Sequence, residues 1–473
     1  MNLELPSYIA GEAIRTGDTL DVFYPWDGSR SGSVVKINRK HLEQAIGAAL
    51  EGQKNPLSRY ERHAILRKAS VLLAERKEEF ANTIRLESGL CMRDTSYETG
   101  RCCDVIEFAA AEALKDDGQV FSCDISPQGK ARKIATFRQP VQLVAAITPF
   151  NHPLNQVAHK VAPAIAAGAP ILLKPSEKTP LTAIKFAELL YDAGLPGWML
   201  SAFVGDLDEV VSPMIVHDDV ELVSFTGSVE IGKHIARTAG YKKLCLELGG
   251  NSPLIILDDA DLDLAVRLAA EGSFRNSGQR CTAVKRILVQ EGILSEFTQR
   301  FVEMAKEYRA GDPNSLETRV GTVIDEAAAK TLETRVQTAV SDGAEVLLGG
   351  QRHGALMEPT VIANVSRETP MVAEESFGPL APILKIRDLD DAIAYYNGGR
   401  FGLSSGIVTN DMQAAFRAAK ELRTGSTNIN EVPGYRIESS PFGGIKDSGL
   451  GIKEGVIESI KFMSNIKTFS FAW

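Results

Sequence analysis

The run Val141-Gln142-Leu143-Val144-Ala145-Ala146-Ile147-Thr148 opens a stretch in which short apolar segments alternate with segments of helical period. Aliphatic and β-branched residues dominate these runs, as in buried strands. The pattern predicts further strands at 170–173, 201–204, 221–226 and 243–248, and helices at 155–167, 182–193 and 229–239. Such alternation predicts a parallel sheet covered by helices, with a ligand, by default a nucleotide, at the carboxyl ends of its strands.

A second α/β series follows from 252 to about 448, beginning with a strand at 253–257, a helix at 262–274 and a strand at 286–290. A chain of 473 residues is longer than a single hydrophobic core supports, so more than one domain is expected. Two flanking stretches, 130–138 and 460–471, alternate apolar and polar residues like exposed strands. Strands of this kind often pair with another subunit.

The composition is that of a globular protein and excludes several classes of function. The 52 basic and 61 acidic residues give a net charge of −9, without a basic cluster that would follow a phosphate backbone, so we expect no nucleic-acid partner. Six dispersed cysteines without C-x-x-C spacing favour reduced thiols, and no metal site is expected. The N-terminus lacks a leader pattern and no run reaches membrane-spanning length, which predicts a cytoplasmic protein without membrane association.

Cys281 is the strongest candidate nucleophile. It lies in the run Ser277-Gly278-Gln279-Arg280-Cys281, where a glycine and a cation next to the thiol are expected to lower its pKa. Glu247, in Glu247-Leu248-Gly249-Gly250, precedes it by 34 residues and is a candidate base. A thiol with a nearby carboxylate predicts covalent catalysis.

A phosphate-binding turn is expected at Phe225-Thr226-Gly227-Ser228, where a strand ends and a helix begins. Backbone N–H groups at a helix N-terminus bind phosphate, although Ser228 is equally explained as a simple helix cap. The run from Gly227 to Lys233 starts like a P-loop but has His234 where the magnesium-binding hydroxyl belongs. A G-x-G-x-x-G turn is also absent after the first strand.

Arg101 lies in a predicted helix at 98–114, preceded by Ser96-Tyr97, and shares a face with Val105 and Phe108. Its spacing from Glu98 favours an ion pair within the helix.

Taken together, the motifs resemble those of the aldehyde dehydrogenase superfamily along nearly the whole chain. The matching runs are Pro149-Phe150-Asn151-His152-Pro153, Lys174-Pro175-Ser176-Glu177, Phe225-Thr226-Gly227-Ser228, Glu247-Leu248-Gly249-Gly250, Gly278-Gln279-Arg280-Cys281, Glu375-Ser376-Phe377-Gly378-Pro379 and Ser440-Pro441-Phe442-Gly443-Gly444. The resemblance implies oxidation of an aldehyde with NAD or NADP. It also implies an aldehyde dehydrogenase-like α/β fold, with a Rossmann-like NAD-binding domain at 1–122 and 141–249, a catalytic domain at 250–448, and oligomerisation strands at 123–140 and 459–473 of a homodimer or homotetramer.

The resemblance assigns roles to individual residues. Cys281 would attack the aldehyde carbon, Asn151 and the backbone N–H of Cys281 would hold the oxyanion, and Glu247 would activate the hydrolytic water. The cofactor-binding residues it implies are Thr148, Pro149, Lys174, Ser176, Glu177, Gly205, Phe225, Thr226, Gly227, Ser228, Leu248, Gly249, Glu375 and Phe377. Glu177 near the adenosine ribose favours NAD, although Lys174 leaves NADP possible.

Departures from the usual motifs indicate an anionic substrate. The substrate-binding residues expected are Arg101, His152, Arg280, Thr282, Arg436 and Phe442. Guanidinium groups bind phosphonate, phosphate and carboxylate oxygens in pairs, so three arginines suggest an anion clamp. The set resembles that of members that oxidise phosphonoacetaldehyde. The alternatives are non-phosphorylating oxidation of glyceraldehyde 3-phosphate, oxidation of a semialdehyde such as succinate semialdehyde, a catalytically inactive structural or binding homologue, and a nucleotide hydrolase.

Overall fold

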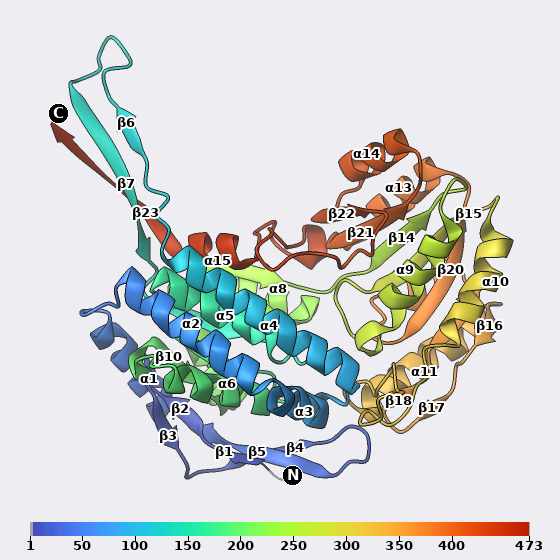
Figure 1. The fold of residues 1–473 in the computed structure, drawn as a ribbon, viewed down its shortest axis with the longest axis horizontal. Helices are drawn as coiled ribbons and strands as arrows, with labels where there is room; N and C mark the ends of the chain where they lie inside the picture. The colour runs from blue at the N-terminus through green and yellow to red at the C-terminus, as the bar shows by residue number, and fades with distance from the viewer. Residues whose placement is uncertain (1–2, 473) are drawn as a thin grey trace.

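The computed structural model describes residues 3–472, so the outermost residues of the predicted first and last segments lie outside it. Two lobes, each built on a seven-stranded sheet, lie side by side, and a long arm projects from one of them (Figure 1).

The first sheet contains the predicted parallel strands. Its order is β13 (Lys243–Glu247), β12 (Leu222–Thr226), β8 (Val144–Ile147), β9 (Ile171–Lys174), β10 (Leu200–Ala202), β2 (Ser7–Ile9) and β3 (Glu12–Ile14). The strands from β13 to β10 run parallel, and β2 joins β10 in the antiparallel sense. The nucleotide-type sheet expected from the sequence is therefore present.

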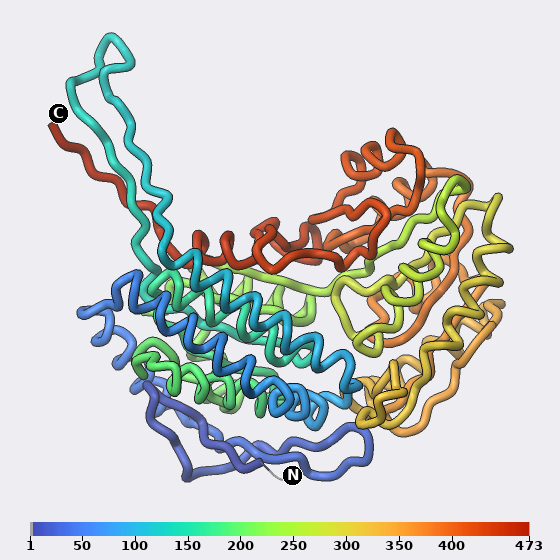
Figure 2. The backbone as a smooth tube through the Cα atoms, viewed as in Figure 1, coloured from blue at the N-terminus to red at the C-terminus, as the bar shows by residue number. Residues whose placement is uncertain are grey.

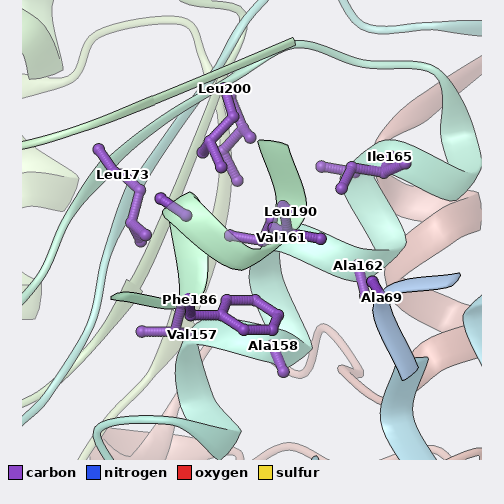
Figure 3. Packing of buried hydrophobic residues seen from close by; sticks show 14 of the residues in the cluster. Ala69, Val157, Ala158, Val161, Ala162, Ile165, Leu173, Phe186, Leu190 and Leu200 are labelled. Atoms are coloured by element: carbon purple, nitrogen blue, oxygen red, sulfur yellow. The ribbon is translucent and has the colours of Figure 1, made fainter. Parts of the chain in front are cut away.

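Helices cover both faces of this sheet because successive strand residues point to opposite sides. Leu173 of β9 packs with α2 (Arg59–Glu75), α4 (Met92–Ala113), α5 (Asn155–Ala167) and α6 (Leu181–Asp192). Its neighbour Leu172 packs with α1 (Arg39–Gly52) and α8 (Val229–Thr238). Figure 3 shows Val157, Val161 and Phe186 on the first of these faces, close to Leu173 and Leu200.

Two predicted elements differ at their ends. The strand expected at 201–204 divides, because β11 (Val204–Gly205) leaves the first sheet and pairs with β5 (Arg30–Ile37). Helix α4 begins at Met92 rather than at 98, so Ser96 and Tyr97 lie inside it. The N-cap, Cys91, makes no side-chain capping bond, so the sequence carries no capping signal at the true start.

The second sheet forms the other lobe. Its order is β16 (Glu345–Leu348), β19 (Thr360–Ala363), β20 (Leu380–Ile386), β15 (Val284–Gln290), β14 (Ser252–Ile256), β21 (Ser404–Val408) and β22 (Ser426–Ile429). Helices α9 (Leu262–Phe274), α10 (Leu294–Ala305), α11 (Glu326–Ser341), α13 (Leu389–Gly398) and α14 (Met412–Glu421) contribute to two apolar cores that contain residues from opposite faces of the sheet. The connection from β13 to β14 joins the two lobes.

The arm consists of β6 (Val120–Ser122), β7 (Arg132–Pro140) and β23 (Ser464–Ala472), all antiparallel. Its strands extend well beyond the body, and the chain ends along the arm (Figure 2). The strand expected at 460–471 begins only at Ser464, because residues up to Phe462 complete α15 (Val456–Phe462), where Ile460 and Phe462 pack on the first core.

The other elements connect or edge these layers. They are β1 (Leu3–Leu5), β4 (Thr19–Phe23), α3 (Lys77–Ser88), α7 (Ser212–Val216), β17 (Arg352–His353), β18 (Leu356–Met357) and α12 (Pro370–Ala373).

Candidate active site

The carboxyl edge of the first sheet collects four of the predicted residues. Strand register pairs Lys174 with Ile147, Ile147 with Phe225, and Thr226 with Glu247, so Thr148, Lys174, Thr226 and Glu247 follow one line along the edge. The hydroxyls of Thr148 and Thr226 are buried and have no hydrogen-bond partner among the described residues. Unpaired buried hydroxyls at a sheet edge favour a bound ligand that supplies the missing partner.

The turn after β12 fits a dinucleotide phosphate. Ser228 caps α8, because its hydroxyl accepts from the N–H of Ile231 at 3.4 Å. This capping role is compatible with phosphate binding at the same turn. A Cβ atom at Gly227 would lie 2.5 Å from the Phe225 ring, and one at Gly205 would lie 2.7 Å from Val210. A side chain at either position would force its neighbour to move, so the two glycines keep the backbone open, at Gly227 beside the N-terminus of α8.

Further cofactor candidates lie on two loops. Lys174 donates to Glu177 at 3.2 Å, the Glu177 carboxylate is exposed, and the Ser176 hydroxyl accepts from Lys178. On the other loop, Glu375 accepts from the N–H of Gly250 at 3.1 Å. Burial raises the pKa of Glu375.

Two aromatic rings and two flanking residues complete the cofactor set. The Phe377 ring meets the Phe150 ring edge-on at 5.8 Å. Pro149 and Leu248 directly follow Thr148 and Glu247 at the sheet edge.

Glu247 ends β13 and is 1% exposed. Neither carboxylate oxygen has a hydrogen-bond partner among the described residues. Burial raises the pKa of Glu247 well above its usual range and the nearby Glu454 raises it further, whereas Arg436 and Lys160 lower it. Burial also opposes ionisation of Glu454, but the ammonium of Lys160 at 3.0 Å holds its pKa down at about 2. The Glu247 carboxyl group therefore readily keeps its proton, whereas the neighbouring Glu454 stays ionised.

A strained loop presents the candidate nucleophile. Asn276, Ser277 and Gly278 all have left-handed φ angles, of 59°, 52° and 68°. The N–H of Asn276 donates to Asp94 at 2.9 Å, and a Cβ at Gly278 would collide with the carbonyl of Gly378. These contacts hold the loop in a conformation that two non-glycine residues would otherwise avoid.

Asn151 is tied to the same loop. Its side-chain amide donates to the backbone carbonyl of Gln279 at 2.9 Å. Its backbone carbonyl accepts from the side-chain amide of Asn276 at 3.0 Å. An amide NH2 has two donors, so one N–H of Asn151 remains for another acceptor.

Cys281 is partly exposed and lies against the Glu247–Gly250 turn, since a Cβ at Gly250 would collide with its carbonyl. Burial raises the pKa of the Cys281 thiol, and the carboxylates of Glu247 and Glu375 raise it further. Arg436 and Lys285 lower it without reversing the shift. The prediction that the pKa of the Cys281 thiol is lowered is therefore wrong.

Arg280 does not direct its guanidinium at the sulfur. It donates to the carbonyls of Glu271 and Gly272 at 3.2 and 2.8 Å, at the end of α9. Burial and the nearby Arg275 lower the pKa of Arg280 to about 10, and its Nε has no partner among the described residues.

Arg101 pairs with Glu438, not with Glu98 as its helix spacing suggested. Glu98 instead accepts from the backbone N–H groups of Leu154 and Asn155 at 2.8 and 2.9 Å and so caps α5. His152 lies beside the same carboxylate, its Nδ1 3.5 Å from Glu98. The helix N-terminus competes successfully for the carboxylate because it offers two aligned donors.

Glu438 joins Arg101 to a buried histidine. His159 is 2.5 Å from its second oxygen. Burial opposes the charge of Glu438, but the hydrogen bond from His159 and the charges of Arg101 and Arg436 hold its pKa well below the usual range. The sequence did not predict Glu438, Lys160, Lys285 or Glu454, because each has at least one partner far away along the chain.

Arg436 is the expected substrate residue that is least satisfied within the protein. Its guanidinium stacks 4.1 Å from the centre of the Phe442 ring, and its Nη1 is buried without a hydrogen-bond partner among the described residues. The loop that carries it packs against Thr282, since a Cβ at Gly434 would lie 2.5 Å from the Thr282 hydroxyl. Arg436 also acts electrostatically on Glu247 and Cys281, so it lies near both catalytic candidates.

The fold and this arrangement of thiol, carboxylate and sheet edge define an oxidoreductase of the aldehyde dehydrogenase type. The chain belongs to the aldehyde dehydrogenase family, which it matches over residues 13–469. It is an enzyme that oxidises aldehydes with NAD or NADP, and the predicted aldehyde dehydrogenase fold is confirmed.

Three relatives illustrate the range of the family around this chain. The 3-sulfolactaldehyde dehydrogenase of Priestia megaterium (strain ATCC 12872 / QMB1551) is 37% identical over 457 residues, which cover 97% of this chain and 96% of the relative. Aldehyde dehydrogenase 21 from Physcomitrella patens, solved with the reaction product succinate, superposes with a TM-score of 0.96 at 35% identity, covering 100% of this chain and 99% of that one. NADP-dependent glyceraldehyde-3-phosphate dehydrogenase from Bacillus halodurans C-125, solved with NADP, gives a TM-score of 0.96 at 31% identity, with 99% of each chain covered.

None of the helices within residues 3–472 combines the length and apolar character needed to span a membrane. The same residues contain no group of three or more histidine, cysteine or acidic side chains placed to hold a metal ion.

Proposed function

We propose that this enzyme oxidises a short aldehyde carrying a second, anionic group to the carboxylic acid, with phosphonoacetaldehyde as the first candidate and phosphonoacetate as its product. The observation that carries the proposal is the buried, unpartnered Nη1 of Arg436. The Arg436 side chain as a whole is only partly buried, but this N–H donor is shielded from solvent and lacks an acceptor among the described residues, so the site favours an anionic ligand that accepts from it.

The three relatives support an anionic group without deciding its chemistry. Their names or bound product carry a sulfonate, a carboxylate or a phosphate. The surroundings of Arg436 limit the negative charge that the site can balance. Glu438 already neutralises Arg101, and backbone carbonyls already accept from Arg280. A monoanionic sulfonate or carboxylate is therefore the main competitor of the phosphonate.

The catalytic cycle follows from the candidates that the loop and the sheet edge bring together. The Cys281 thiolate attacks the aldehyde carbon, and the free N–H of Asn151 with the Cys281 backbone N–H stabilises the oxyanion of the thiohemiacetal. The sheet edge, the Gly227-Ser228 turn and Glu375 would hold the dinucleotide, which would accept the hydride that the thiohemiacetal carbon loses as it becomes a thioester. The Glu247 carboxylate then takes a proton from water, which attacks the resulting thioester and releases the acid and the thiol.

NAD is the proposed cofactor, in preference to NADP. Glu177 is exposed beside Lys174 at the end of β9, and its carboxylate would repel a 2′-phosphate. A kcat/KM for NADP above that for NAD would refute this preference.

The domain and assembly predictions extend this proposal. Residues 1–122 and 141–249 would bind the cofactor and 250–448 would contribute the nucleophile. The arm, with its exposed Phe469 and Ile466, would pair with a second copy in a dimer or tetramer. Light scattering that shows only monomers at micromolar concentration would refute the assembly.

An NADH-formation assay tests the substrate proposal. The panel contains phosphonoacetaldehyde, 3-sulfolactaldehyde, glyceraldehyde 3-phosphate, succinate semialdehyde and propanal. We expect the highest kcat/KM with phosphonoacetaldehyde and the lowest with propanal. A preference for propanal would overturn the anionic-substrate proposal, and a preference for another anion would overturn only its phosphonate. No NADH with any aldehyde would point to a catalytically inactive homologue.

A further inference from the structure

Lys285 is a buried lysine that the catalytic cycle above does not use. It lies on β15, four residues after the candidate nucleophile, and is 2% exposed. Its Nζ donates to two backbone carbonyls, Gly278 at 2.8 Å and Ser376 at 2.6 Å, and lies 4.9 Å from the centre of the Phe377 ring. No carboxylate among the described residues forms an ion pair with it within 4.0 Å.

The two carbonyls belong to different functional loops. Gly278 lies in the left-handed turn that presents Cys281, whereas Ser376 lies between the cofactor candidates Glu375 and Phe377. The loops are in direct contact, since a Cβ at Gly278 would collide with the carbonyl of Gly378. One ammonium group therefore connects the nucleophile loop to the cofactor loop.

A second connection closes a ring of contacts. Glu375 accepts from the N–H of Gly250 at 3.1 Å, and Gly250 packs against the carbonyl of Cys281. The path from Cys281 through Gly250 and Glu375 to the Ser376 carbonyl returns through Lys285 to Gly278. Removal of the Lys285 ammonium would break this ring of contacts, because the hydrogen bonds to Gly278 and Ser376 would both be lost.

The charge of Lys285 acts on the thiol in addition to its hydrogen bonds. Two carboxylates, Glu247 and Glu375, disfavour the thiolate, and Lys285 and Arg436 are the cations that favour it. Lys285 is embedded in the protein and fixed by two carbonyls. Burial lowers its pKa to about 8, although Glu375 favours the charged form, so most Lys285 side chains carry their charge at pH 7 before any ligand binds. A cation close to a thiol lowers its pKa.

We propose that Lys285 is a positioning residue that couples the Cys281 loop to the 375–377 cofactor loop and favours the Cys281 thiolate. The proposal concerns the enzyme whatever aldehyde it oxidises. It predicts that both the ionisation of the thiol and the binding of the dinucleotide depend on a residue that contacts neither reacting group.

Replacement of Lys285 by methionine tests both parts. The rate of Cys281 alkylation by iodoacetamide, measured against pH in the absence of cofactor, should show the thiol pKa raised by about 1 unit. Alkylation at pH 7 should slow about ten-fold. The KM for NAD, measured with saturating propanal, should rise about ten-fold, as expected for the loss of hydrogen bonds from a charged donor.

Lys446 offers a matched control. Its Nζ also donates to two backbone carbonyls, Asn397 and Gly399, both at 3.0 Å, and lies 5.7 Å from the Tyr396 ring. It is not among the charges that act on the Cys281 thiol. Lys446→Met should leave the alkylation profile and the KM for NAD unchanged.

Two further variants separate charge from position and keep the test open if Lys285→Met fails to fold. Lys285→Arg retains the charge and should restore a thiol pKa near that of the parent while the KM for NAD stays high. Lys285→Gln retains N–H donors without charge and should shift the thiol pKa. Unchanged alkylation profiles and NAD affinity in either Met or Gln, or equal losses in Arg and Gln, would overturn the proposal.

Discussion

The cofactor edge of the first sheet and the substrate loop around Arg436 hold their functional residues in different ways. At the edge, Lys174, Thr226 and Glu247 are fixed by strand register, so neighbours in the sheet determine where each residue lies. On the loop, Arg436 stacks on Phe442, and Glu438 connects the loop to Arg101 and His159 far away in the sequence. Residues placed by backbone hydrogen bonds tolerate side-chain changes, whereas residues placed by side-chain partners depend on each of them.

The difference in charge balance is equally informative. Lys160 satisfies Glu454 behind the sheet edge, and Glu438 satisfies Arg101 beside the loop. Glu247 and Arg436 retain buried atoms without partners. Unsatisfied groups of opposite charge thus lie near the thiol, one suited to activating water and the other to holding an anion.

The largest expected effect is the loss of the nucleophile. Cys281→Ala removes the sulfur that forms the covalent intermediate, so kcat/KM should fall by roughly four orders of magnitude or more. NADH formation and labelling by iodoacetamide measure the loss. Cys123→Ala, in the arm between β6 and β7, should retain full activity. Turnover by Cys281→Ala comparable to the parent would place the nucleophile elsewhere.

Glu247→Gln should block the second half of the cycle. Steady-state turnover should fall about 10²–10⁴-fold. One equivalent of NADH per active site should still form in a burst, with an acyl adduct of Cys281 visible in the intact mass. Because burial raises the pKa of Glu247, the parent should deacylate faster as pH rises and the carboxylate form increases. Absence of both burst and adduct would assign Glu247 to the first half of the cycle.

Arg436→Ala should separate anionic from neutral aldehydes. Loss of a charge-assisted hydrogen bond should reduce kcat/KM for the best anionic aldehyde about 10–100-fold, with propanal little affected. Arg101→Ala should have a smaller effect, since Glu438 already neutralises Arg101. Equal losses with both aldehydes would refute the anion-binding role of Arg436. A larger effect of Arg101→Ala than of Arg436→Ala would show that the arginine paired with Glu438 matters more for the anion than the unpaired one.

The sequence predicted those parts of the structure that depend on local pattern. The apolar runs indicated the strands of the first sheet, and α5 has the predicted limits, Asn155–Ala167. The motifs indicated the family because they gather at strand ends and turns, where local sequence determines local shape. The start of α4 was predicted too late because Cys91 does not cap it through its side chain.

Long-range partners account for what the sequence did not reveal. Arg101 is separated from Glu438 by 337 positions, and no spacing rule relates the two. The spacing rule that applies within a helix pointed to Glu98, which the N-terminus of α5 engages instead. Lys285 resembled an ordinary strand residue, since its two carbonyl acceptors become apparent only when the loops at 278 and 376 meet.

Thr226→Val tests whether an unpaired hydroxyl at the sheet edge awaits a ligand. Valine has the same shape without the polar group, so the KM for NAD should rise about five-fold through one lost neutral hydrogen bond. Tm without cofactor should stay constant or increase, because a buried orphan hydroxyl is removed. Thr331→Val, at an exposed position of α11, should alter neither quantity. An unchanged KM would show that the dinucleotide does not use Thr226.

The smallest effect concerns the stability of the scaffold behind this edge. Glu87 of α3 accepts from the N–H groups of Leu181 and Thr182 at 2.7 and 3.2 Å and caps α6, and burial raises its pKa to about 8. The unfolded chain releases this proton near the ordinary value of 4.5, whereas the folded protein keeps it, so the unfolding free energy should fall as pH rises through that window. Glu87→Gln cannot ionise and should flatten this slope, while Glu78→Gln, exposed on the same helix, should preserve it. Denaturant unfolding at several pH values measures both slopes, and identical slopes for parent and Glu87→Gln would mean that Glu87 caps α6 as an ordinary carboxylate.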